Sequence, residues 1–129
     1  METSRQAIAA FNRGDSERLI EFLTPDCQWR PAMLAAVEGA EFQGHAGLNA
    51  YVEATADTWE EFRIVADEFR AVGEDRVLVL GRIQGRGRGS GVQVERLWAV
   101  VHSFRAGKIT RVHAFLGHAD ALEAVGLEE

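Results

Sequence analysis

The stretch that decides the fold runs from Val92 to Leu116 and reads VQVERLWAVVHSFRAGKITRVHAFL. Its β-branched and aromatic residues predict two strands, and the dipeptide Ala106-Gly107 is typical of a tight turn between them. We therefore predict a β-hairpin, and pairing of Arg105 with Lys108 sets its register.

In this register both faces of the hairpin are largely apolar, so both should be covered. The face with smaller side chains comprises Glu95, Leu97, Ala99, Val101, Ser103, Thr110, Val112 and Ala114. The bulkier face comprises Trp98, Val100, His102, Phe104, Ile109, Arg111, His113 and Phe115. We expect the smaller face to line a hollow core. We expect the bulkier face to lie outside and to form a homodimer through the sheet, because a row this apolar is rarely left in water.

The rest of the chain supplies helices and strands for this hairpin to pack against. Thr3 with Gln6 resembles a capping box, and Asp15 can cap a second helix. The expected elements are a helix from Thr3 to Gly14, a helix between Asp15 and Pro25, strands at Cys27–Arg30 and Glu41–Gly44, a helix at His45–Trp59, strands at Phe62–Val72 and Arg76–Gly85, the hairpin, and a helix at Ala119–Val125. This order predicts an α+β fold in which a curved antiparallel sheet wraps around the N-terminal helices.

Length and composition narrow the class of protein. We expect residues 1–129 to form a single domain. A net charge of -6 disfavours nucleic-acid binding, which needs a basic surface. The sequence has no apolar run long enough for a membrane span and no signal peptide, and its single cysteine, Cys27, fits a reducing compartment. These features predict a cytoplasmic protein with no nucleic-acid and no membrane partner.

Motifs for cofactors and metals are also missing from the sequence. There is no phosphate-binding loop, no dinucleotide fingerprint and no nucleophile elbow. His102 and His113 would be neighbours across the hairpin, but no third and fourth ligand has suitable spacing. We expect neither a cofactor nor a metal.

Several short motifs resemble the SnoaL-like family of the nuclear transport factor 2-like superfamily. They are Asn12-x-Gly14-Asp15, Leu23-x-Pro25-Asp26-x-x-Trp29, Gly44-x-x-Gly47-Leu48, Gly107-Lys108-Ile109 and Ala121-Leu122-Glu123-Ala124-x-Gly126-Leu127. The resemblance covers essentially the whole chain. It implies a cone-shaped, cystatin-like α+β barrel, a deep apolar pocket between helices and sheet, and frequent dimerisation through the sheet.

The resemblance implies little about chemistry, because this fold hosts many activities. The acid–base positions of ketosteroid isomerases fall at Ala7, Pro31 and Ala99. Those of limonene epoxide hydrolases fall near Gly81, Ile83 and Ala114. Polyketide cyclases that resemble SnoaL use a carboxylate near the end of the last strand, and many relatives carry an aspartate where this chain has Gly117. None of these side chains can move a proton, so we expect neither isomerisation of steroids nor epoxide hydrolysis.

Two classes of function stay open at this point. The first is a non-catalytic protein that binds a small hydrophobic molecule in an apolar pocket. Its predicted ligand-binding residues are Trp29, Met33, Tyr51 and Ser103, with Met33 in an apolar flap over the pocket. Trp29 and Tyr51 could equally be ordinary core residues.

The second class is an isomerase, a polyketide-cyclase-like enzyme or a hydrolase that uses Glu95 as its acid or base. Glu95 is the one carboxylate on the face expected to line the hollow. In an apolar pocket its pKa would rise and it could transfer protons. The alternative is that Glu95 lies in solvent or pairs with an arginine.

Overall fold

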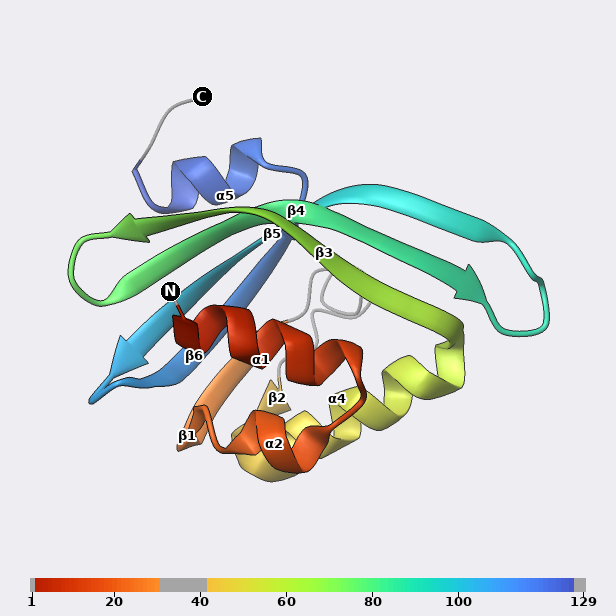
Figure 1. Cartoon of the computed structure of the whole chain (residues 1–129), viewed down its shortest axis with the longest axis horizontal. Helices are drawn as coiled ribbons and strands as arrows, with labels where there is room; N and C mark the ends of the chain where they lie inside the picture. The colour runs from red at the N-terminus through yellow and green to blue at the C-terminus, as the bar shows by residue number, and fades with distance from the viewer. Residues whose placement is uncertain (1, 31–41, 127–129) are drawn as a thin grey trace.

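The computed structural model of the protein describes residues 2–30 and 42–126. Its helices and strands, in chain order, are α1 (Glu2–Asn12), α2 (Ser16–Ile20), β1 (Leu23–Arg30), β2 (Phe42–Gln43), α4 (Gly44–Thr58), β3 (Trp59–Val72), β4 (Arg76–Gly87), β5 (Gln93–Arg105), β6 (Lys108–Leu116) and α5 (Ala119–Ala124). Long curved strands cross the molecule, with α1, α2 and α4 on one side and α5 on the other (Figure 1). The predicted α+β class and curved sheet are confirmed.

The six strands form one sheet in the order β2-β1-β6-β5-β4-β3. All neighbours pair antiparallel except β1 and β6, which run parallel. Pro25 was expected to stop the second helix, but it lies inside β1, where the pairing with β6 shifts between Leu23 and Gln28. A proline donates no ladder hydrogen bond, so an irregular stretch of a strand tolerates it.

The main core lies between the inner, concave face of the sheet and the helices α1, α2 and α4. The most deeply buried large side chains there include Leu19, Leu23, Leu48, Ile83 and Ile109. Asn12, in the last turn of α1, fastens this helix to β3, because its side-chain amide both donates to the carbonyl of Ile64 and accepts from its N–H, each at 2.8 Å. Apolar burial therefore holds the helices against the sheet, and this pair of hydrogen bonds adds to it for α1.

A second, smaller core lies on the outer, convex face, where α5 covers the sheet. It is formed by Leu78, Leu80, Ala99, Val101, Ala121 and Leu122. His118 precedes α5, and its Nε2 lies 2.9 Å from the carbonyl oxygen of Gly81.

A Cβ at Gly81 would lie 2.0 Å from the carbonyl oxygen of Val65, so only glycine fits where β3 and β4 come this close.

The predicted hairpin exists, but its two faces are the reverse of the prediction along β5. The register is as expected for Arg105 with Lys108 and for Phe104 with Ile109, but a bulge then pairs Ser103 with Arg111 instead of Thr110. A one-residue bulge changes which residues share a face. The inner face consequently carries Trp98, Val100, His102, Ile109, Val112 and Ala114.

This reversal removes most of the apolar row that motivated the predicted homodimer. Trp98, Val100 and Ile109 are buried beneath the helices, and of the row only Phe115 contacts the outer cluster under α5. The homodimer stays a prediction without that support.

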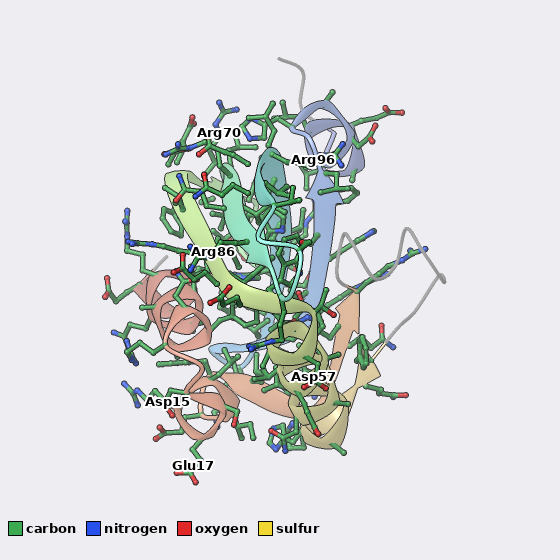
Figure 2. The ribbon with its side chains drawn as sticks, turned by 90° about the vertical axis from the view of Figure 1, so that its right-hand side faces the viewer. Asp15, Glu17, Asp57, Arg70, Arg86 and Arg96 are labelled. Carbon is green, nitrogen blue, oxygen red and sulfur yellow. The ribbon has the colours of Figure 1, made fainter. Side chains whose placement is uncertain are left out.

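Charged side chains gather on the surface. Glu17 on α2 points away from the body of the protein, and Arg70 lies at its edge, as Figure 2 shows.

No helix in the part of the chain that the structure describes is long and apolar enough to cross a membrane.

Candidate functional site

A small apolar cavity lies inside the main core, between α1, α2 and α4 and the inner face of the sheet. Its volume is about 40 Å³. It is lined by Ala7, Ile8, Phe11, Leu19, Leu23, Trp29, Tyr51, Phe62, Ile64, Trp98, Val100, His102, Ile109, Val112 and Ala114. One water needs roughly 10–15 Å³ of such space, so the cavity as it stands has room for only a few waters.

His102 is the most polar side chain on the cavity wall. It lies on β5 and is 4% exposed, and its Nδ1 lies 2.8 Å from the hydroxyl oxygen of Ser4 on α1, which is fully buried. Burial lowers the pKa of His102 from 6.5 to about 4, because the cationic ring would lose its hydration. The imidazole is therefore neutral at pH 7.

Tyr51 of α4 is the second titratable group on the wall. Burial raises the pKa of its phenol to about 12, so the phenol keeps its proton. Its ring centroid lies 5.8 Å from that of Phe11, 5.7 Å from that of Trp29 and 5.6 Å from that of Phe42. These contacts fix the ring of Tyr51 within an aromatic cluster.

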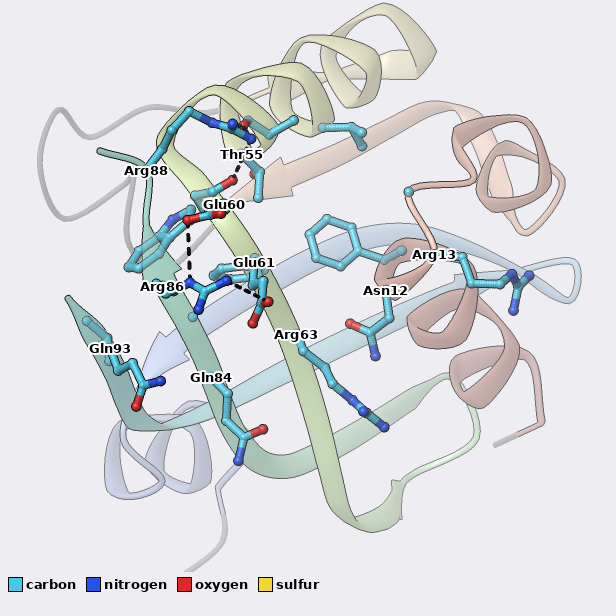
Figure 3. A pocket seen from close by; sticks show the side chains of 18 of the residues that line it. Asn12, Arg13, Thr55, Glu60, Glu61, Arg63, Gln84, Arg86, Arg88 and Gln93 are labelled. Carbon is cyan, nitrogen blue, oxygen red and sulfur yellow. Dashed lines mark hydrogen bonds and ion pairs between the residues drawn. The ribbon is translucent and has the colours of Figure 1, made fainter. Parts of the chain in front are cut away.

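A larger, open groove lies beside this cavity, at the ends of α1 and α4 and along the strands β3, β4 and β5. It has a volume of about 1380 Å³. Figure 3 shows its charged lining, in which Arg86 points toward both Glu60 and Glu61. Arg88 donates to the carbonyl oxygens of Ala56 and Trp59 at the end of α4. The contacts of Arg86 and Arg88 are therefore with other residues that line the groove.

Phe11 and Phe62 line both the cavity and the groove. Their ring centroids are 6.0 Å apart, and the rings meet edge to face. Both side chains are only half-buried. The two rings thus separate the apolar interior from the open groove, and a molecule that passes from one to the other must displace them.

The expectation that Glu95 faces the hollow is wrong. Its side chain is 57% exposed, and its carboxylate lies 2.7 Å from Nε2 of Gln84 and 3.8 Å from Arg82 on the outer face of β4. Glu95 also lines the open groove, but it does not line the apolar cavity. The face reversal in β5 is the cause, because the odd-numbered residues of this strand point outward.

The other predicted site residues divide into three groups. Trp29 and Tyr51 line the cavity, and their binding role stays a prediction. Ser103 pairs with Arg111 and Arg76 on neighbouring strands and does not line the cavity, so its predicted position in the hollow is wrong for the same reason as that of Glu95. Met33 and the proposed flap lie outside the described residues.

Sequence reasoning did not single out Ser4 and placed His102 on the outer face. Alternation correctly put His102 on one face of β5 with Trp98 and Val100, but both faces of this strand are apolar, so the sequence did not tell which of them meets the helices. Within residues 2–30 and 42–126, no group of three or more histidine, cysteine, aspartate or glutamate side chains could hold a metal ion.

Comparison with known proteins identifies the family. The family model described as SnoaL-like domain matches residues 4–112, which is most of the chain. Among proteins with curated annotation, none matches this sequence.

Solved structures with the same fold are numerous. A protein of unknown function from Burkholderia pseudomallei, described as nuclear transport factor 2-like, is 23% identical with a TM-score of 0.81, covering 98% of this chain and 96% of its own. TerC, co-crystallised with polyporic acid, is 23% identical with a TM-score of 0.79, covering 96% of this chain and 95% of its own. A hypothetical protein with a ketosteroid isomerase-like fold from Catenulispora acidiphila, in complex with trimethylamine, is 18% identical with a TM-score of 0.79, covering 98% of this chain and 94% of its own. At these identities the likeness establishes the fold.

Proposed function

The chain belongs to the SnoaL-like domain family, and we propose that it binds a small, uncharged, mostly apolar molecule in the cavity between its helices and its sheet. The observation that carries the proposal is an interior hollow lined by aromatic and aliphatic side chains with very few polar groups. Ligand sites of proteins typically combine such a lining with a small number of placed polar groups.

The cavity is favoured over the groove because of the chemistry of its lining. Among the described residues that line the cavity, none carries a formal charge at pH 7. In the groove, acidic side chains such as Glu60 and Glu61 already neutralise Arg86, and solvent reaches the lining. An apolar molecule gains about 25 cal/mol for each Å² of surface that it removes from water, which favours the cavity with the apolar lining.

A ligand larger than a few waters must enlarge this cavity. Typical ligand pockets measure roughly 300–1,000 Å³, far more than this cavity provides. Phe11 and Phe62 are the side chains that can make room, since they border the groove on their other side. We therefore propose that the ligand enters from the groove as these two rings swing toward solvent.

Two of the similar structures were solved with small organic molecules, polyporic acid and trimethylamine. Proteins with this fold can therefore bind small molecules. The chemical class of ligand that we propose for this chain is inferred from the lining of its own cavity. Nothing in the placement of Glu95 favours an acid–base enzyme in the cavity, so we do not propose one.

The proposal is tested with indane, an uncharged bicyclic hydrocarbon, by titration calorimetry and thermal unfolding. We expect saturable one-to-one binding, and a rise in unfolding temperature that follows RT ln(1 + [L]/Kd). A Leu97→Ala variant is the matched control, because Leu97 is an exposed leucine on the outer face and its loss removes apolar surface away from the cavity. The control should bind indane as the wild type does. Absence of saturable binding by the wild type would overturn the proposal.

A further inference from the structure

We infer that His102, oriented by Ser4, is the polar contact for the ligand and selects a molecule that carries one hydrogen-bonding oxygen on an apolar ring system. This inference rests on the proposed function, because it concerns the same cavity. It adds what the apolar lining alone does not specify, namely the chemical group that the ligand presents and the residue that receives it.

The geometry of the pair is the first support. Ser4 comes from α1 and His102 from β5, so the bond of 2.8 Å joins the two layers that enclose the cavity. Both side chains are buried, at 0% and 4% exposure. A buried polar pair is costly unless its hydrogen bonds are made, so this one fixes the imidazole ring in a single orientation.

Because of the Ser4 hydroxyl, the Nε2 atom of His102 can be either a hydrogen-bond donor or an acceptor. A serine hydroxyl both donates and accepts, so Nδ1 can be satisfied with or without its own proton. When the Ser4 hydroxyl donates to Nδ1, Nε2 carries the proton and can donate to a carbonyl oxygen of a ligand. When Nδ1–H donates to Ser4, Nε2 has a lone pair and can accept from a ligand hydroxyl. The common requirement is one oxygen that can form a hydrogen bond.

The rest of the lining excludes charged ligands. No described lining residue is charged at pH 7, so an ionised group would be desolvated without a partner. His102 itself stays neutral, since burial holds its pKa near 4. An uncharged carbonyl or hydroxyl, in contrast, exchanges its bond to water for one to the imidazole.

Tyr51 is the other polar side chain that could contact the ligand oxygen, but its surroundings make it less available. Three aromatic rings, those of Phe11, Trp29 and Phe42, lie within 5.6 to 5.8 Å of its own ring, centroid to centroid. Its ring is therefore held by packing within this cluster, and its hydroxyl already interacts with the side chain of Thr55 on the same helix. His102 is held by its polar bond to Ser4. Tyr51→Phe is thus the matched control, because it deletes a different polar group from the same cavity wall.

The test uses two probes of one skeleton, indane and 2-indanol, which differ by a single hydroxyl group. In the wild-type protein, nitrogen-15 NMR of the histidine ring follows His102 directly. We expect 2-indanol to shift the Nε2 signal of His102, and indane to shift it far less. Equal effects of the two probes on Nε2, or no effect of 2-indanol, would overturn the inference.

Variants give the second readout. Relative to wild type, His102→Phe should lower the preference for 2-indanol over indane by roughly 3- to 10-fold, the usual worth of one hydrogen bond. Ser4→Ala should lower the preference less and should move the Nδ1 signal, because the ring loses its orienting partner. Tyr51→Phe should leave the preference unchanged. If Tyr51→Phe removes the preference and His102→Phe keeps it, the assignment to His102 is wrong.

Failure of the inference and failure of the proposed function look different. If indane does not bind to the wild type at all, the proposed function fails. If indane binds but the hydroxyl of 2-indanol is not recognised through His102, only the inference fails. The NMR measurement needs no substitution, so it decides the question even if His102→Phe does not fold.

Discussion

Replacing Ala114 with valine should stabilise the protein and at the same time weaken ligand binding. Ala114 lies on the inner face of β6, pairs with Val100 and lines the cavity of about 40 Å³. Valine adds two methyl groups, suits a strand, and can place them in the hollow. Filling unoccupied apolar space is the one kind of core enlargement that need not create strain.

The magnitude follows from the buried carbon. At about 0.8 kcal/mol for each buried carbon group, two methyl groups stabilise by at most about 1.6 kcal/mol. For a chain of 129 residues this corresponds to a rise in Tm of roughly 3–6 °C. Chemical denaturation should show a higher midpoint with an unchanged slope. Binding of indane should be weakened, because the two methyl groups occupy part of the space that the ligand would take.

The matched control is Ala71→Val, the same substitution at an exposed position of strand β3. It reports the intrinsic preference of valine for strands and should change stability by only a few tenths of a kcal/mol. Destabilisation of the Ala114→Val variant by 1–3 kcal/mol, the usual cost of overpacking, would mean that the hollow is not usable space. An unchanged affinity for indane would mean that the ligand lies elsewhere.

Three further predictions concern single residues. Burial lowers the pKa of folded His102 from 6.5 to about 4, so its contribution to the free energy of unfolding is complete above pH 6.5 and falls by about 3 kcal/mol as the pH drops to 4. The His102→Phe variant should lose less stability over this range in urea denaturation, and an equal loss in wild type and variant would refute the lowered pKa of His102. Glu95→Gln should leave indane affinity unchanged and alter stability by less than about 1 kcal/mol, because the carboxylate is exposed and its ion pair is a surface one; a tenfold loss of affinity would contradict its placement. Gly81→Ala should destabilise by about 3 kcal/mol in thermal unfolding, since the new Cβ would lie 2.0 Å from the carbonyl oxygen of Val65, and a neutral effect would mean that the strands are farther apart.

The order of elements could be predicted from the sequence because local signals were strong. Glycine at Gly14 and Gly117, the side-chain cap at Asp15, and the dipeptide Ala106-Gly107 mark ends and turns that the structure has. The strand-forming content of Val92–Leu116 likewise predicted a hairpin, whose strands β5 and β6 run antiparallel. These features depend on backbone conformation, which nearby residues determine.

The orientation of the hairpin could not be predicted, because both of its faces are apolar. Alternation separates the faces of a strand but does not tell which one meets the helices when both are buried. Here α5 covers Ala99 and Val101, so the smaller face lies outside, and the bulkier side chains of Trp98 and Val100 fill the wide core. The bulge at Ser103 added a second change, since it shifts the parity of β6 relative to β5.

Only part of the candidate site was predicted, because the face of β5 was assigned wrongly. Trp29 and Tyr51 were expected in the wall of the hollow and lie there, because strand β1 and helix α4 have only one apolar side each near these residues. Ser103 and Glu95 were misplaced together with the face of β5. The bond between Ser4 and His102 joins residues 98 positions apart, and no local pattern predicts such a pair.

The most direct test of the central claim is a crystal structure of the protein grown with 2-indanol. We predict that the ring lies between α1 and the inner face of β5, against Trp98, with its oxygen within hydrogen-bonding distance of Nε2 of His102. Phe11 and Phe62 should have moved toward the groove relative to their present positions. A bound molecule found only in the open groove, or an unchanged cavity at saturating 2-indanol, would contradict the account.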